Sequence, residues 1–540
     1  MTIGFILATK RTRAVHLKTR TGCDTCKARR VKCDETKPNC RRCAVGARKC
    51  VYNTATTPPP RFVVKVYLPP AQGQPVLFVN DRGLDYFQRN LAAELDGRFD
   101  DSAFWSKLVL QLSHAEPSVR HAVSAISIVY RDIESSLQSR SEYVVANPEV
   151  QNEWDKAVKS LSARIDAQPQ SILVPLVCSL LFTCVEFLRG NNNHAMLHAQ
   201  SGLKILGAHH HRYEKAGPLD GERSPDNKLH FVPEELTAIE EHVIPTFSRL
   251  SLLCTLTGEP RGPALYHSTA NGGSPHEDLS DSRRRLYDLS NAFAGFINET
   301  HPKAHMFNIG IDDFAKQAKL QVKLDEWYEQ LTELLERLQA ARKPVKDEAL
   351  YLLLTHYKVL YIWIRVCTTA GELATDAYLA EFEELVRYAE RMTDNGSGTS
   401  AFRPLSFDLQ LVGPAHYAAL KCRDPALRRR ALELLRKGPR REGPWNAHHA
   451  YVTAKRLIEF EERELNDQGY PTEVARVHGL PLPGDEARVQ SHGKISSESW
   501  EYDHSMVPSP NCPGTLEVIF QTKPWGLMGD WHTTTEYLEL

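Results

Sequence analysis

The chain has 540 residues, more than one domain usually holds, so we expect a small module beside one large or two fused domains. Its 42% hydrophobic and 25% charged residues are ordinary for a soluble protein and exclude neither an enzyme nor a regulator. The near-neutral total hides an asymmetry, because residues 1–52 hold 14 Lys and Arg against 3 Asp and Glu while the remainder is acidic. Clustered cations indicate a polyanion-binding end, although charge alone equally allows a solvated basic tail.

Two apolar stretches, residues 172–188 and 350–367, resemble membrane spans at first sight. Glu186 interrupts the first and Lys358 the second, so both are predicted to be buried core helices. The apolar run at residues 4–7 is too short for a secretory signal. We therefore expect a protein that stays inside the cell and has no membrane partner.

Six of the twelve cysteines lie between positions 23 and 50, in two halves with the same spacing. Each half has a C-x2-C pair and, after six intervening residues, a third cysteine; thiolate sulfur is the ligand that zinc favours in structural sites. Two tetrahedral zinc ions need eight ligand positions, so two thiolates must bridge both metals, and the first and fourth cysteines are the symmetric choice. The predicted ligands of two Zn²⁺ ions are Cys23, Cys26, Cys33, Cys40, Cys43 and Cys50.

Disulfides and ordinary buried thiols are the alternatives to metal for this cysteine cluster. Disulfides are rare in intracellular proteins. Between Cys23 and Cys50, only Val31, Val45 and a few alanines could form an apolar core without metal or cross-links. Metal must therefore hold the module together, and its folding free energy would be largely metal-binding free energy, on the order of 10 kcal/mol.

A basic segment separates the second cysteine from the third. Its four cations and lack of a helix breaker suit a short helix with an exposed cationic face. Arginine matches guanine O6 and N7 with its planar fork, whereas lysine more often contacts phosphates. The alternative is a zinc-dependent protein-interaction scaffold without sequence-specific DNA readout. The predicted DNA contacts are Lys27, Arg29, Arg30, Lys32, Arg41 and Arg42.

The run from Thr21-Gly22-Cys23 to Cys50-Val51-Tyr52 resembles the fungal binuclear zinc cluster family of transcription factors. The resemblance implies that the first and fourth cysteines, Cys23 and Cys40, bridge the two zinc ions. It also implies that the adjacent pair Arg29 and Arg30 contacts bases, because that family uses the basic pair after the second cysteine in this way.

The same resemblance gives expectations for partners and location. Lys27 and Lys32 would contact phosphates, and family members typically recognise CGG-like triplets. A zinc-dependent regulator of RNA polymerase II transcription is implied, in the nucleus, with double-stranded DNA and the transcription machinery as partners. A basic arm at residues 1–20 precedes the cluster at 21–52 and suits nuclear entry or phosphate contacts.

Residues 53–78 form a predicted proline-rich linker. No a/d heptads follow the cluster, so a homodimer stays open but without an evident coiled coil to form it. The segment 61–67 has strand character, and we expect it to pair with residues 516–520.

The fold is predicted to be mainly α. From residue 79 to 466 the apolar residues recur with helical periodicity, which indicates a large all-helical domain, followed by a C-terminal extension at 467–540 with a short β segment. The stripe at 324–338 spans barely two heptads, so core packing is favoured over a zipper. The predicted core faces contain Phe104, Trp105, Leu108, Val109, Leu112, Val119, Ala122, Val123, Ile126, Tyr130, Leu324, Trp327, Leu331, Leu334, Leu335 and Leu338.

Two segments of this domain, residues 184–206 and 421–445, resemble the regulatory domain of one branch of the same fungal factors. In the second segment Asp424 precedes Pro425 and predicts a helix start, with residues 428–430 on the outer face and Gly438 at the end. We therefore expect a helical regulatory domain.

Catalytic motifs are missing, since we find no G-x-S-x-G, phosphate loop or dinucleotide glycine pattern; the prediction is that the protein is not an enzyme. His276 has no second histidine at metalloprotease spacing. His194 and His198 have i, i+4 spacing, but acidic or cysteine partners are missing, so core or solvated histidines are favoured over a metal site. Cys178 and Cys184 are predicted to be buried thiols.

Overall fold

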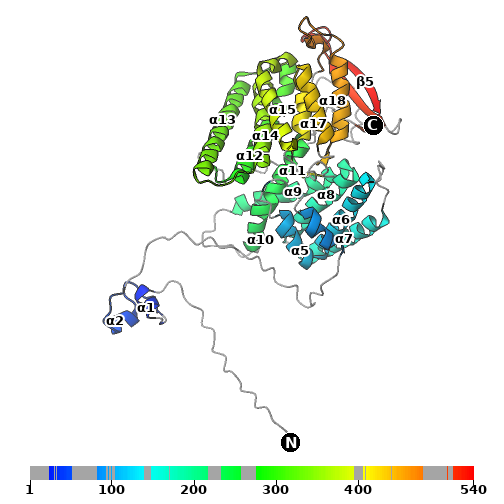
Figure 1. Cartoon of the computed structure of the whole chain (residues 1–540). Helices are drawn as coiled ribbons and strands as arrows, with labels where there is room; N and C mark the ends of the chain where they lie inside the picture. Colours follow the sequence, from blue (N-terminus) through cyan, green and yellow to red (C-terminus); the bar gives the residue numbers. More distant parts are fainter. Residues whose placement is uncertain are drawn as a thin grey trace. The chain divides into compact units, whose positions relative to one another are not determined.

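The computed structural model describes residues 23–29, 31, 33–50, 82–92, 95, 99, 104–138, 147–168, 171–216, 233–256, 275–394, 405–407, 409–438, 441–477, 507–508 and 515–539. The chain divides into two compact units, Met1–Tyr67 and Leu68–Leu540 (Figure 1). In the described part of the first unit the helices are α1, Asp24–Ala28, and α2, Arg41–Val45. Each follows a cysteine of the predicted metal cluster.

The first half of the second unit is helical. Its elements are α3 (Arg82–Tyr86), the π-helices η1 (Phe87–Leu91) and η2 (Phe104–Val109), α5 (Leu110–Ala115), α6 (Pro117–Gln138), α7 (Pro148–Ala167), α8 (Leu173–Arg189), α9 (Asn192–Ala216), α10 (Pro233–Ala238), the π-helix η3 (Ile239–Val243) and α11 (Ile244–Leu256). Burial confirms the predicted core residues from Phe104 to Tyr130, although the first turns are π-helical.

The second half begins with long helices and ends in strands. Its elements are α12 (Leu279–His305), α13 (Ile311–Ala340), α14 (Asp347–Val366), the 3₁₀-helix η4 (Glu372–Tyr378), α15 (Leu379–Asp394), α16 (Val412–Lys421), α17 (Pro425–Lys437), β1 (Arg441–Glu442), β2 (Trp445–Asn446), α18 (Ala447–Glu461), η6 (Glu473–Ala475), β3 (Val507–Pro508), β4 (Thr515–Thr522) and β5 (His532–Glu539). Figure 1 shows α13 at one edge of this group of helices and β5 at the opposite edge. The mainly α prediction, with a short C-terminal β segment, is confirmed.

Each half has its own apolar core. The first core is formed by residues between Leu84 and Leu250, together with Leu405 and Phe407 from a later segment. The second extends from Leu252 to Phe520 and also takes in Phe99. Of the predicted stripe of α13 it includes Leu324, Trp327, Leu331 and Leu334, whereas Leu335 and Leu338 are only partly buried against it. These long-range insertions tie the two halves into one unit.

Helix α8 lies at the centre of the first core, because 15 of its 17 residues are buried. It ends at Gly190, whose φ of 80° is a left-handed conformation that side chains disfavour. In the next helix, Gly202 lies so close to α11 that an added Cβ would stand 2.3 Å from the Phe247 ring. Among the described helices, none combines the length and apolar character that a membrane span requires.

The C-terminal strands form an antiparallel sheet in the order β3-β4-β5. Strand β4 buries Leu516, Val518 and Phe520, and the Phe520 ring stacks on Phe460 of α18 with centroids 5.5 Å apart. The predicted strand at 516–520 is therefore confirmed. Its predicted partner, 61–67, lies outside the described residues.

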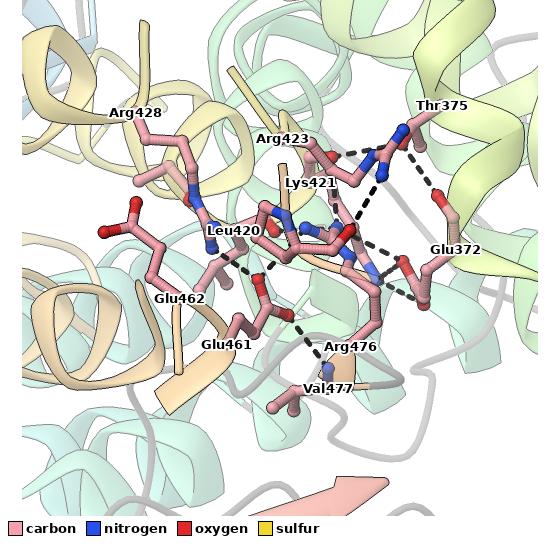
Figure 2. Close-up of polar contacts among 12 residues, drawn as sticks. Glu372, Thr375, Leu420, Lys421, Arg423, Arg428, Glu461, Glu462, Arg476 and Val477 are labelled. Carbon is pink, nitrogen blue, oxygen red and sulfur yellow. Dashed lines mark hydrogen bonds and ion pairs between the residues drawn. The ribbon is translucent and has the colours of Figure 1, made fainter. Parts of the chain in front are cut away.

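The α16–α17–α18 region is held by a buried charge network (Figure 2). Asp424 caps α17 as predicted, and its side chain accepts a hydrogen bond from the Leu427 backbone N–H at 2.8 Å. The prediction that residue 428 lies on the outer face is wrong. Arg428 is fully buried, and its Nη2 lies 2.7 Å from Oε2 of Glu461 on α18. The same oxygen accepts from Nη1 of Arg476 at 3.0 Å.

Candidate zinc and DNA-binding site

The first unit is built around sulfur atoms. Cys23 and Cys40 directly precede helices α1 and α2 and cap them, because their sulfur atoms accept hydrogen bonds from the backbone N–H groups of Cys26 and Cys43, both at 3.4 Å. The sulfur therefore takes the place of the oxygen that usually caps a helix. Each short helix turns its second cysteine back toward the first.

The two halves repeat the same geometry. The backbone N–H of Cys23 donates to the Cys33 sulfur at 3.4 Å, and that of Cys40 donates to the Cys50 sulfur at 3.3 Å. These donors favour the thiolate form, because hydrogen bonds to a charged group stabilise its charge. The internal repeat of the sequence is thus a repeat of structure.

The sulfur separations fit tetrahedral zinc. With Zn–S bonds of about 2.3 Å, two sulfurs on one zinc ion lie about 3.8 Å apart. The Cys23 sulfur lies 3.7 Å from that of Cys40, 3.7 Å from Cys43 and 3.8 Å from Cys33. The Cys40 sulfur lies 3.6 Å from that of Cys26. The Cys26 and Cys43 sulfurs also lie 3.9 Å apart, so the sulfur atoms of the two halves form one cluster.

Burial of the sulfurs favours a bound cation. It raises the pKa of the Cys26 thiol to about 12 and that of Cys40 further. Burial acts in the same direction on Cys23, but hydrogen bonds, chiefly from Cys26, outweigh it and lower the pKa to about 6. Thiolates in such a site need positive charge close by, which zinc would supply, and the thiols would release their protons when zinc binds.

Apolar packing contributes little to this unit. Among the residues of this unit that the structure describes, five buried cysteines form the core, with only Val31 and Cys50 packed against them as partly buried residues. Val45 is 90% exposed. The described part of the unit thus has no hydrocarbon core that could replace the metal.

Two polar contacts connect the halves and were not predicted from the sequence. The Thr25 hydroxyl donates to the Lys49 carbonyl at 2.7 Å. The Asp34 carboxylate accepts from the Arg41 backbone N–H at 3.0 Å, and hydrogen bonds from the Thr36 hydroxyl and from Arg41 lower its pKa to about 2. Small polar residues give no periodic signal that would single out these roles.

Four of the six predicted DNA contacts are described, and all four side chains are exposed. They are Lys27, Arg29, Arg41 and Arg42. Arg29 caps the end of α1, while the Lys27 amine lies 3.6 Å from the Asp24 carboxylate on the same helix. Arg30 and Lys32 lie outside the described residues. Two further exposed cations, Arg48 and Lys49, follow α2 and were not among the predicted contacts.

The other metal candidates do not form a cluster. Among the described residues, the groups of three or more close metal-ligand side chains all belong to the cysteine module. The His198 ring packs on Trp154 and Phe182, with centroids 5.6 and 5.4 Å away. His276 is fully buried and its Nδ1 lies 2.9 Å from the Ser282 hydroxyl.

The remaining predictions of buried thiols are confirmed, since Cys178 and Cys184 are both fully buried. Burial raises the pKa of Cys178 to about 12 and that of Cys184 further, so neither is a reactive thiolate.

Comparison with known proteins gives two matches along the chain. Residues 21–59 match the fungal Zn(2)-Cys(6) binuclear cluster domain, and residues 82–238 match the fungal specific transcription factor domain. The chain is 22% identical to the aspercryptin biosynthesis cluster-specific transcription regulator atnN of Emericella nidulans, over 89% of this chain and 93% of that protein.

Shorter matches are more similar. The Zn(2)-C6 fungal-type transcription factor afumD of Aspergillus fumigatus is 35% identical over 22% of this chain and 34% of its own length. The lysine biosynthesis regulatory protein LYS14 of Saccharomyces cerevisiae is 64% identical over 33 residues, which are 6% of this chain and 4% of that protein. No solved structure matches the chain.

Proposed function

We propose that this chain, which belongs to the fungal binuclear zinc cluster transcription factors, regulates RNA polymerase II transcription by binding DNA in a sequence-specific manner. The observation that carries the proposal is the sulfur cluster of residues 23–50, with exposed cations around it. The family is one of transcription regulators, and a binuclear cluster domain of this type binds two zinc ions.

The six cysteines are the proposed zinc ligands. Cys23 and Cys40 bridge the two ions, and each ion takes two further thiolates, Cys26 and Cys33 on one and Cys43 and Cys50 on the other. The sulfur separations of 3.6–3.8 Å along the edges of these two tetrahedra support this arrangement.

Arg29 and Arg30 are the proposed base contacts, recognising a CGG-like triplet in the major groove. The exposed position of Arg29 at the end of α1 supports this role, because a guanidinium fork there can approach guanine O6 and N7. The proposed phosphate contacts are Lys27, Lys32, Arg41 and Arg42.

The organisation that we propose has a basic arm at 1–20, the zinc cluster at 21–52, a linker at 53–78, a regulatory domain at 79–466 and an extension at 467–540. The protein acts in the nucleus with the transcription machinery as its partner. A homodimer would form without a coiled coil next to the cluster.

The test is a gel-shift titration of the zinc-loaded full chain, on sites selected from a random DNA pool. Binding should vanish in Cys23→Ala and in strong chelator, and should fall steeply with salt. Selected sites containing CGG triplets would support the proposal, and their spacing would report the number of copies on DNA. Binding that is weak and insensitive to salt would favour a protein-interaction scaffold.

A further inference from the structure

Helix α13 has two apolar stripes on opposite faces. The inner stripe, which includes Leu324 and Leu331, packs into the second core. Successive residues of an α-helix are about 100° apart, so the residues at 311, 315, 318 and 322 project from the face opposite to Leu331. Their spacing of four, three and four residues is the a/d spacing of packed helices. Figure 1 shows α13 at an edge of its group of helices, and the four residues of this outer stripe are exposed: Ile311, Ala315, Ala318 and Val322.

Exposed apolar side chains are concentrated on this helix and the turn before it. Six of the sixteen large hydrophobic side chains that the described residues expose lie between positions 306 and 328. Ile311 is 87% exposed, while Phe314 and Val322 are 52% and 55% exposed. A contiguous apolar patch on a soluble protein marks a surface that another molecule covers. The charges beside the outer stripe indicate which molecule this is.

The charges on one flank of the outer stripe are self-complementary. Lys319 and Lys323 each lie within about 20° of Asp312 around the helix axis, and all three side chains are exposed. When two copies of a helix pack antiparallel about a two-fold axis, the same flank of each copy meets. An antiparallel pair centred on the outer stripe places Asp312 of one copy about 3 Å along the axis from the levels of Lys319 and Lys323 of the other. Both long side chains can reach that carboxylate, and the two-fold axis repeats the ion pairs.

We propose that the outer stripe of α13 binds the outer stripe of a second copy of this chain, antiparallel about a two-fold axis. With the axis midway between Ala315 and Ala318, Ile311 of each copy faces Val322 of the other, and Ala315 faces Ala318. The two small alanines at the centre let the helices approach closely, while the larger side chains close the ends of the contact. Phe314, on the flank away from Asp312, would cover Ala318 of the other copy.

The contact extends over about three helical turns, which is at the small end of specific interfaces. The dimer should therefore be weak, with a dissociation constant in about the micromolar range. The inference rests on the homodimer of the proposed function and gives it an interface. Its test contains no DNA, so a failure of this contact is distinguished from a failure of DNA recognition, which the gel-shift titration measures.

The test is sedimentation velocity of the zinc-loaded full chain, without DNA, from about 1 µM to about 100 µM. A reversible monomer–dimer equilibrium is expected. Ile311→Ser should weaken association about tenfold or more, because an apolar side chain is lost from the interface twice. Leu197→Ser, at an exposed leucine of α9, is the matched control and should associate like the unmodified protein. A chain that stays monomeric over this range, or an equal loss in both variants, would overturn the proposal.

Charge reversal tests the antiparallel arrangement. Asp312→Lys alone, and Lys319→Asp together with Lys323→Asp, each place like charges opposite one another, so each protein should stay monomeric. An equimolar mixture of the two proteins should dimerise again, because every residue 312 then faces opposite charges across the axis. Recovery in the mixture also shows that both variants are folded. Undiminished association of either variant alone, or a mixture that stays monomeric, would refute this interface.

Discussion

The sulfur atoms of Cys23 and Cys40 lie 3.7 Å apart, although the residues are separated by 16 others in the chain. The line between these two sulfurs is an edge shared by two zinc tetrahedra only if Cys23 and Cys40 each bind both zinc ions. Substitution of either of these two cysteines should therefore affect zinc binding more than substitution of any of the other four.

Loss of a bridging cysteine should release more zinc than loss of a terminal one. Cys23→Ala removes a ligand from both ions and should leave well under one zinc per chain, whereas Cys33→Ala should retain about one. Metal content of the purified variants by atomic emission checks this. Equal zinc loss in the two variants would contradict the bridging role.

The salt dependence of DNA binding should distinguish residues that contact bases from residues that contact phosphates. Arg29→Ala should cost about 1–3 kcal/mol of binding free energy on a CGG site and relax specificity there, because a bidentate guanine contact is lost. Lys27→Ala should weaken binding evenly across sequences and reduce the slope of log K against log salt by about 1. Titrations by fluorescence anisotropy on CGG and scrambled sites distinguish the two. Equal losses on both sites for Arg29→Ala would argue against base recognition.

The zinc site was more predictable from the sequence than the buried charge network in the second unit. Cysteine spacing is a local signal, and it correctly predicted that the six sulfur atoms lie together. Helical periodicity likewise predicted buried faces such as Val119 and Leu331. It could not distinguish the π-helix at 104–109 from an α-helix, because the same residues are buried in either.

Arg428 shows where local patterns fail. Three consecutive arginines suggest an outer face, yet the partner of Arg428 is Glu461, 33 residues later on another helix. Arg429 and Arg430, its neighbours, are indeed partly exposed and pair with Glu462 and Glu390. Whether an arginine is buried depends on a tertiary partner that the sequence around it does not contain.

Glu461 should be far more important for stability than its neighbour Glu462. Glu461→Gln leaves Arg428 and Arg476 buried without their shared carboxylate, so unfolding free energy should fall by about 3–5 kcal/mol. Glu462→Gln is the matched control, because its Arg429 partner is exposed, and it should cost less than about 1 kcal/mol. Urea denaturation monitored by circular dichroism measures both. A loss below about 1 kcal/mol in Glu461→Gln would show that the buried network is not a stabilising element.

Acid should destabilise the second unit through the protonation of His416 on unfolding. This side chain is buried beside Trp445, and burial lowers its pKa to about 3. A histidine that is neutral in the folded state but protonated in the unfolded state favours folding above its ordinary pKa near 6.5 and opposes it as the pH falls toward 3. Between pH 6.5 and pH 5 this residue alone should cost about 2 kcal/mol of unfolding free energy.

The substitution His416→Gln removes the titrating group and should flatten the fall in stability over this pH interval by the same amount. Its stability at pH 7 can be lower for packing reasons, so the measurement is the difference between urea midpoints at pH 6.5 and pH 5, not the value at one pH. The exposed His114→Gln is the control and should keep the full pH dependence. An unchanged slope in His416→Gln would mean that this histidine becomes accessible to protons without unfolding, and that other groups with a lowered pKa, such as the half-buried His449, cause the acid sensitivity.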